Sequence, residues 1–119
     1  MVTSEDLDGI LKALDRMGAR GVAVLDKDGT HIASNLPGDI SKNTFSIMCA
    51  TVMGAAKTAN SELDREPLEK VTIESKDRRI IMINAGQKLV LSVIVSSKAN
   101  LDRVVESVSK AAKEIENKS

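Results

Sequence analysis

The spacing of apolar residues changes along the chain and predicts both helices and strands. Near the N-terminus these residues recur at steps of three and four, as on one face of a helix: Leu7, Ile10, Leu11, Leu14 and Met17. Thr3 or Ser4 can cap this helix, and Gly18 can end it. Residues 101–115 carry a second stripe of this kind, so a C-terminal helix that begins at Asn100 is predicted.

Short apolar runs between these two helices predict strands. Residues 21–25 and 30–34 flank the segment Asp26–Gly29, whose Asp-Gly step suits a tight hairpin turn. Three further strands, separated by compact polar turns, should form an antiparallel meander over residues 68–75, 79–84 and 88–96. The runs IIMI and LVLSVIV in the last two indicate strands that are buried on both faces.

The middle of the chain contains an unusual segment, because the run from Thr44 to Ala56 has no charged residue in a protein that is 29% charged. The run is too long for an ordinary strand and shorter than the roughly 20 apolar residues of a membrane span. We interpret it as a helix that Ser41 or Asn43 caps and that extends to about Leu63. An amphipathic surface helix would have a polar side, so this one should be covered on both sides.

A helical wheel divides this segment into two sides. The larger residues suit the sheet, with Met53 at their margin: Phe45, Met48, Cys49, Val52, Ala56 and Ala59. The opposite side is mostly small: Ile47, Ala50, Thr51, Gly54 and Thr58. Such a side lets a second helix approach to the usual 8–10 Å, so a two-fold homodimer through these residues is predicted. In a monomer this side would be solvated, with Lys57 and Ser46 dominating it.

Strands that are buried on both faces require helices on both sides of the sheet. Each terminal helix has one narrow apolar stripe, so the two should share one face while the middle helix covers the other. The predicted fold class is α+β, with three α/β/α layers in the order α-β-β-α-β-β-β-α. Residues 1–119 are expected to form a single domain.

Composition excludes several classes of function. Lys plus Arg and Asp plus Glu number 17 each, so no net charge draws the chain to nucleic acid or anionic lipid. Phe45 is the only aromatic residue, which removes stacking platforms for bases. The single cysteine, Cys49, excludes an internal disulfide, and the acidic N-terminus lacks an apolar signal core. We therefore expect a soluble cytoplasmic protein without membrane insertion.

No residue pattern predicts catalysis, a metal site or a cofactor. His31 and Cys49 are the only residues of their types, and neither has partners at ligand spacing. We interpret His31 as a strand residue near the surface and Cys49 as a small core hydrophobe. The segment Gly54–Thr58 ends in Lys-Thr like a phosphate loop, but it lacks the preceding glycine and lies within a helix.

The order of elements, together with the segment 21–34, resembles the Roadblock/dynein light-chain family. An apolar strand, a polar Asp-Gly turn and an IAS-like second strand stand at this place in the family, and the segment here reads GVAVLDKDGTHIAS. The Ala99-Asn100-Leu101 entry to the last helix and the alanine-rich middle helix also match. The resemblance extends from about Asp6 to Ile115 and rests on the ordered combination of these features.

This resemblance implies a five-stranded antiparallel sheet with one helix on one face and two on the other. It further implies a homodimer through the middle helix and the third strand, where Val71 and Ile73 lie. The implied function is that of a non-enzymatic regulator that binds a small Ras-like GTPase and modulates its nucleotide cycle, with no catalytic residue to assign. A structural adaptor in a larger assembly is the alternative, and a small-molecule sensor comes third because no polar pocket cluster is visible.

Two arginines at a predicted hairpin tip, Arg78 and Arg79, are possible contacts to the partner. An arginine near a GTPase active site can stabilise the transferring phosphate. A solvated turn has the same composition, so the sequence leaves both interpretations open.

Overall fold

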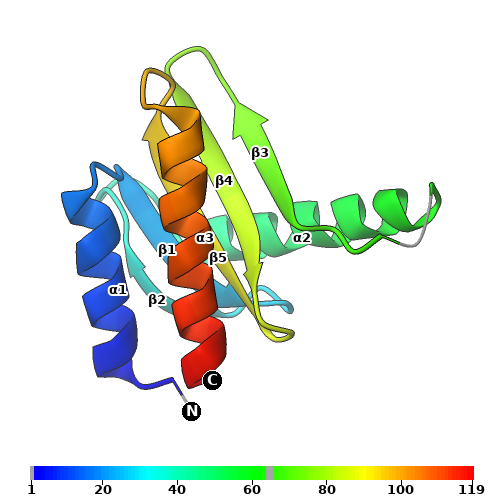
Figure 1. Cartoon of the computed structure of the whole chain (residues 1–119), viewed down its shortest axis with the longest axis horizontal. Helices are drawn as coiled ribbons and strands as arrows, with labels where there is room; N and C mark the ends of the chain where they lie inside the picture. The colour runs from blue at the N-terminus through cyan, green and yellow to red at the C-terminus, as the bar shows by residue number, and fades with distance from the viewer. Residues whose placement is uncertain (1, 64–65) are drawn as a thin grey trace.

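The computed structural model describes residues 2–63 and 66–119, and this part of the chain has the predicted order of elements (Figure 1). The elements are α1 (Ser4–Arg16), β1 (Gly21–Asp26), β2 (His31–Asn35), α2 (Lys42–Ser61), β3 (Lys70–Glu74), β4 (Arg78–Ala85), β5 (Leu89–Ser96) and α3 (Leu101–Lys118). The helices begin at predicted caps, because Thr3, Ser41 and Asn100 each accept a backbone N–H of the first turn. Helix α2 ends two residues before the predicted Leu63.

The strands form one antiparallel sheet in the order β2-β1-β5-β4-β3. The predicted β1–β2 hairpin and the β3–β4–β5 meander are both present, and pairing of β1 with β5 joins them. Strand β5 is therefore central and is buried along almost its whole length, as predicted. Strand β4 is buried only in part, since its first residues belong to a hairpin with exposed edges.

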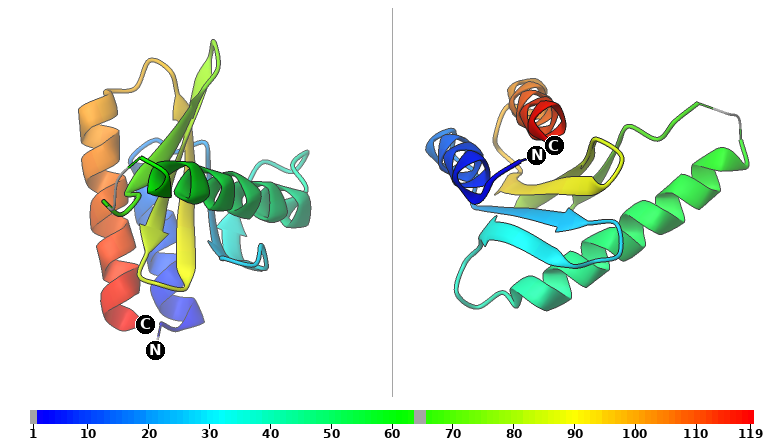
Figure 2. Two further views of the ribbon diagram at one scale, coloured as in Figure 1. Left: turned by 90° about the vertical axis from the view of Figure 1, so that its right-hand side faces the viewer. Right: turned by 90° about the horizontal axis from the view of Figure 1, so that it is seen from below.

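Helices lie on both faces of this sheet, which confirms the three predicted layers (Figure 2). Helices α1 and α3 pack side by side on one face, and α2 alone covers the other. Alternate residues of each strand point into one core or the other: Val24, Leu91 and Ile81 face α1 and α3, whereas Ala23, Val90 and Met82 face α2. The core beneath α2 is the smaller of the two.

The turn between β1 and β2 fixes the position of α2. The Oδ1 atom of Asp26 accepts the backbone N–H groups of Asp28 and Thr30, both at 2.9 Å. Gly29 adopts a φ of +91°, and a Cβ atom at this position would lie 3.0 Å from the Cα atom of Ile47. The Asp-Gly signal therefore predicts the turn correctly, and the same glycine lets the turn press against the helix.

Helix α2 runs across the strands and its C-terminal half extends past the β3 edge of the sheet (Figures 1 and 2). Its sheet contacts are concentrated on β1 and β2. Shortly after the helix, Leu63 is 83% exposed. The C-terminal part of α2 therefore extends beyond the sheet that the rest of the helix covers.

Within the described ranges, no helix combines the length and the apolar character that crossing a membrane would require.

Candidate interaction surface

The structure corrects the predicted division of the α2 wheel. Cys49 and Met53 are buried against the sheet as expected, but Met48 is 53% exposed and Ala59 is exposed, so their assignment to the sheet side was wrong. Ser46, which the monomer alternative placed in solvent, is fully buried. Its hydroxyl donates to the Lys42 carbonyl at 2.7 Å. The hydroxyl is therefore satisfied, and this small residue can lie on the buried side of the helix.

The outward side of α2 carries four of the five α2 residues predicted for the dimer interface. Ile47 is 49% exposed, and Thr51, Gly54 and Thr58 are exposed as well. The hydroxyls of Thr51 and Thr58 donate to carbonyls one turn earlier in their own helix, at 2.8 and 3.1 Å. The hydroxyls of these two threonines are therefore satisfied within the helix itself. Ala50 is half-buried and lies against the β1–β2 turn instead.

A second stripe, which we call the α2 flank, runs beside the first and was not predicted. It consists of Met48, Val52, Ala55 and Ala59, spaced by four, three and four residues. This spacing keeps the side chains in one line along a helix and is the spacing of helix pairs that pack side by side. The three exposed members and half-buried Val52 carry no charge. The spacing in the sequence could have revealed the stripe.

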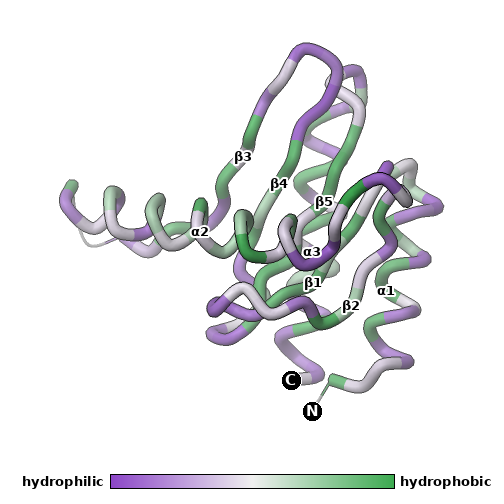
Figure 3. Tube along the Cα trace, turned by 180° about the vertical axis from the view of Figure 1, so that it is seen from behind, coloured by the Kyte–Doolittle hydropathy of each residue, from purple (hydrophilic) through white to green (hydrophobic). Residues whose placement is uncertain are grey.

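Strand β3 is a free edge of the sheet and continues this apolar surface. Val71 and Ile73 pair with Met82 and Ile80, which places both on the α2 side of the sheet. Val71 is half-buried and Ile73 is 38% exposed. Figure 3 shows that the β3–β4 hairpin projects past α2, so strand and helix enclose an angle between them. We call the outward side of α2, the α2 flank and these two β3 residues the apolar corner.

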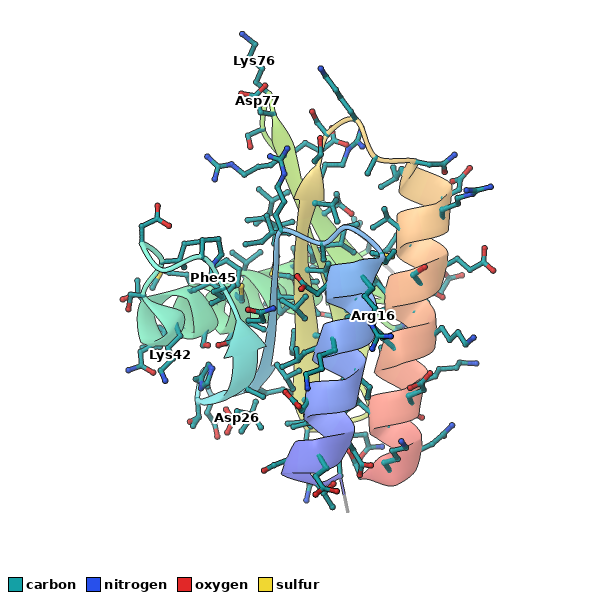
Figure 4. All side chains as sticks on the ribbon, turned by 90° about the vertical axis from the view of Figure 1, so that its left-hand side faces the viewer. Arg16, Asp26, Lys42, Phe45, Lys76 and Asp77 are labelled. Carbon is teal, nitrogen blue, oxygen red and sulfur yellow. The ribbon has the colours of Figure 1, made fainter. Side chains whose placement is uncertain are left out.

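The two candidate arginines differ in their surroundings. Arg79 donates from Nε to Glu74 Oε1 and from Nη1 to the Ser97 carbonyl, both at 2.9 Å, so it ties the hairpin to the turn after β5. Arg78 is exposed and forms no ion pair within the described part of the chain. The tip itself, with Lys76 and Asp77, points away from the rest of the molecule (Figure 4).

The only histidine and the only cysteine are held by serines. His31 Nε2 lies 2.7 Å from Ser34 Oγ, and burial, with a smaller contribution from the charge of Lys42, lowers the pKa of His31. Cys49 is buried and its thiol donates to Ser92 Oγ at 3.6 Å, while burial raises the pKa of the thiol. Among the described residues, no group of three or more His, Cys, Asp or Glu side chains could hold a metal ion.

Comparison with known proteins identifies the family. The Roadblock/LC7 domain model matches residues 7–95. The chain belongs to the Roadblock/LC7 family. An uncharacterized protein of Methanocaldococcus jannaschii is 34% identical over 110 residues, which are 92% of each chain.

Solved structures of other proteins share this fold. Myxococcus xanthus MglB superposes with a TM-score of 0.90 at 19% identity, over 98% of this chain and 96% of that one. The Roadblock/LC7 domain from Streptomyces avermitilis gives a TM-score of 0.87 at 16% identity, over 94% and 96% of the two chains. The resemblance inferred from segment 21–34 and the order of elements is therefore confirmed at the level of family and fold.

Proposed function

We propose that this protein is a non-enzymatic homodimer that binds a small Ras-like GTPase and modulates its nucleotide cycle. The observation that carries the proposal is the apolar corner, a charge-free surface that the chain itself leaves uncovered. Exposed apolar patches of this kind in a Roadblock/LC7 protein favour an interface between protein chains. Membership of the family supports the GTPase as partner.

The geometry of α2 suits a second copy of the same helix. Ala55 and Ala59 on the α2 flank are small enough for two helix axes to approach to 8–10 Å. The helix also extends past its own sheet, and an antiparallel partner would bring its own sheet over that end. Exposed Met48 and Ile47 would then be buried at the interface, each contributing about 1–2 kcal/mol.

Strand β3 suits two-fold antiparallel pairing with its copy, which would make one continuous sheet. A two-fold axis at Thr72 would place Lys70 of one protomer opposite Glu74 of the other, and Val71 opposite Ile73. The charged residues and Thr72 share the face away from α2, whereas the apolar pair lies on the α2 side. Opposite charges and apolar pairs across strands are stabilising, so this register has no unfavourable pair.

The dimer is tested by a charge on the α2 flank. Ala55→Arg should convert the dimer to a monomer of 12.7 kDa, measured by light scattering after gel filtration. The matched control is Ala13→Arg, the same substitution at an exposed alanine of α1, and it should leave the mass unchanged. An unaltered mass for Ala55→Arg would show that the α2 flank is not the interface.

The GTPase function is tested by nucleotide turnover. Ras-like GTPases encoded in the same genome are assayed for GTP hydrolysis and nucleotide release, alone and with this protein. At least one GTPase should change its rate, while this protein alone should hydrolyse no GTP. If none binds or changes rate, and pull-downs recover only scaffold subunits, the adaptor alternative replaces this proposal.

A further inference from the structure

A small cleft lies on the side of α2 that faces the β1–β2 and β4–β5 turns, away from the α2 flank. Its volume is about 190 Å³. Apolar side chains make most of its wall, from α2, the segment before β3 and the start of β5: Ala50, Met53, Leu68 and Val90. Lys27 from the β1–β2 turn and Lys57 from α2 complete the lining, with Gly54 between them on the helix.

The charge of this cleft is of one sign. Among the described residues, no carboxylate belongs to its lining, and neither Lys27 nor Lys57 forms an ion pair. The Asp26 carboxylate in the same turn is engaged, because its Oδ1 accepts two backbone N–H groups of the turn. Asn84, the other polar residue of the lining, donates to the Leu68 carbonyl at 3.3 Å. The two ammonium groups are therefore available to an anionic partner.

The size of the cleft points to a side chain and not to a metabolite. Small-molecule sites usually have about 300–1,000 Å³, which exceeds this volume. An apolar wall with a few charged groups at its rim is also the composition of pockets that receive anchor residues at protein interfaces. Helix pairing through the α2 flank would leave the cleft open, because Ala50, Met53 and Lys57 lie on the other side of α2 and Gly54 borders the cleft from the outward side.

We infer that this cleft receives an apolar side chain of a partner protein, with flanking carboxylates of that partner contacting Lys27 and Lys57. The inference deepens the proposed function and rests on it, since it assigns the cleft as the place where the GTPase docks. Lys57 and Lys27 come from different elements, α2 and the β1–β2 turn, so the turn contact at Gly29 sets their relative position.

The test uses synthetic peptides, so that it does not depend on an identified GTPase. The probes are capped pentapeptides with a central leucine flanked by four glutamates, the same peptide with a central alanine, and a version with four lysines. In ¹⁵N NMR titrations, the glutamate–leucine peptide should shift the amide signals of Gly54, Asn84 and Val90 in a saturable manner. The alanine peptide should bind at least threefold more weakly, and the lysine peptide should cause no shift there.

Variants of the two lysines complete the experiment. Lys27→Glu with Lys57→Glu should weaken peptide binding at least tenfold, Lys57→Arg should retain it, and the control Lys113→Glu on α3 should not change it. Localised shifts that are absent, or equal for both charge types, would overturn the inference even if a GTPase binds. Peptide binding at the cleft without any effect on GTPases would instead contradict the proposed function and leave the cleft assigned.

Discussion

Gly29 offers a sharp test of how the β1–β2 hairpin positions α2, through the substitution Gly29→Ala. Two separate costs act at this residue. Its φ of +91° is one that L side chains rarely adopt, which costs about 1–2 kcal/mol. The added Cβ would also lie 3.0 Å from the Cα of Ile47, a backbone atom that cannot rotate away, and such overpacking costs about 1–3 kcal/mol.

The free energy of unfolding should therefore fall by about 2–5 kcal/mol, a large part of the roughly 5–15 kcal/mol of a typical domain. Two other glycines separate the costs. Gly18 has a φ of +107° and no atom within 4 Å of an added Cβ, so Gly18→Ala should lose about 1–2 kcal/mol. Gly38 has neither a positive φ nor a close neighbour, and Gly38→Ala should stay within about 0.5 kcal/mol of the wild type.

The assay is equilibrium urea unfolding of all four proteins at one protein concentration, because the stability of a dimer depends on concentration. The urea concentration at the unfolding midpoint should be highest for the wild type and Gly38→Ala, lower for Gly18→Ala and lowest for Gly29→Ala. Equal losses for Gly18→Ala and Gly29→Ala would refute the reasoning, since the contact with Ile47 would then add nothing. The hairpin would no longer explain the position of α2.

Three further predictions concern single side chains. Burial raises the pKa of Cys49 above its usual 9.0, so the contribution of the thiol to stability is complete below pH 9 and is lost as the pH rises through the raised pKa. The urea midpoint of the wild type should therefore fall over this pH range, and it should fall less steeply with pH in Cys49→Ala. The pKa of His31 is lowered from 6.5 by burial and by the charge of Lys42, so the contribution of His31 to stability is lost as the pH falls through the lowered pKa. An NMR titration of the imidazole should give a midpoint below 6.5. A midpoint at or above 6.5 would contradict the burial of the ring. Arg79→Ala removes the contacts to Glu74 and the Ser97 carbonyl and should cost about 1–2 kcal/mol in the same unfolding assay, and a loss below 0.5 kcal/mol would show that these contacts do not hold the hairpin.

The elements and their layers could be predicted from the sequence because each has a local signal. The stripe from Leu7 to Leu14 and the Asp-Gly step at Gly29 depend on neighbours close in the chain. The sidedness of the terminal helices follows as well, since each has one narrow apolar stripe. Pairing of β1 with β5 is a contact between distant segments and has no local signal, and only the resemblance to the family implied a single sheet of all five strands.

The orientation of α2 could not be predicted in the same way, because an uncharged helix has no polar side to mark which face is outward. Met48 and Ala59 fall on the flank because the sheet contacts are concentrated on β1 and β2 and the helix crosses the strands towards β3. Ser46 can be buried although it is polar, because its hydroxyl is satisfied within the helix. Hydrophobicity alone would bury Met48 and Ala59 and expose Ser46, which is the opposite of their burial in the structure.

The two sides of α2 differ in charge because different segments of the chain lie next to them. The side towards the turns receives Lys27 from β1–β2 and has its own Lys57, so it carries charge and a cleft. The other side is turned towards the β3–β4 hairpin, where Val71 and Ile73 lie on the α2 side of the sheet and carry no charge. A helix that was uncharged from Thr44 to Ala56 in sequence thus becomes asymmetric only when the hairpins are in place. That asymmetry would let one helix serve the proposed self-association on one side and the proposed docking of a different partner on the other.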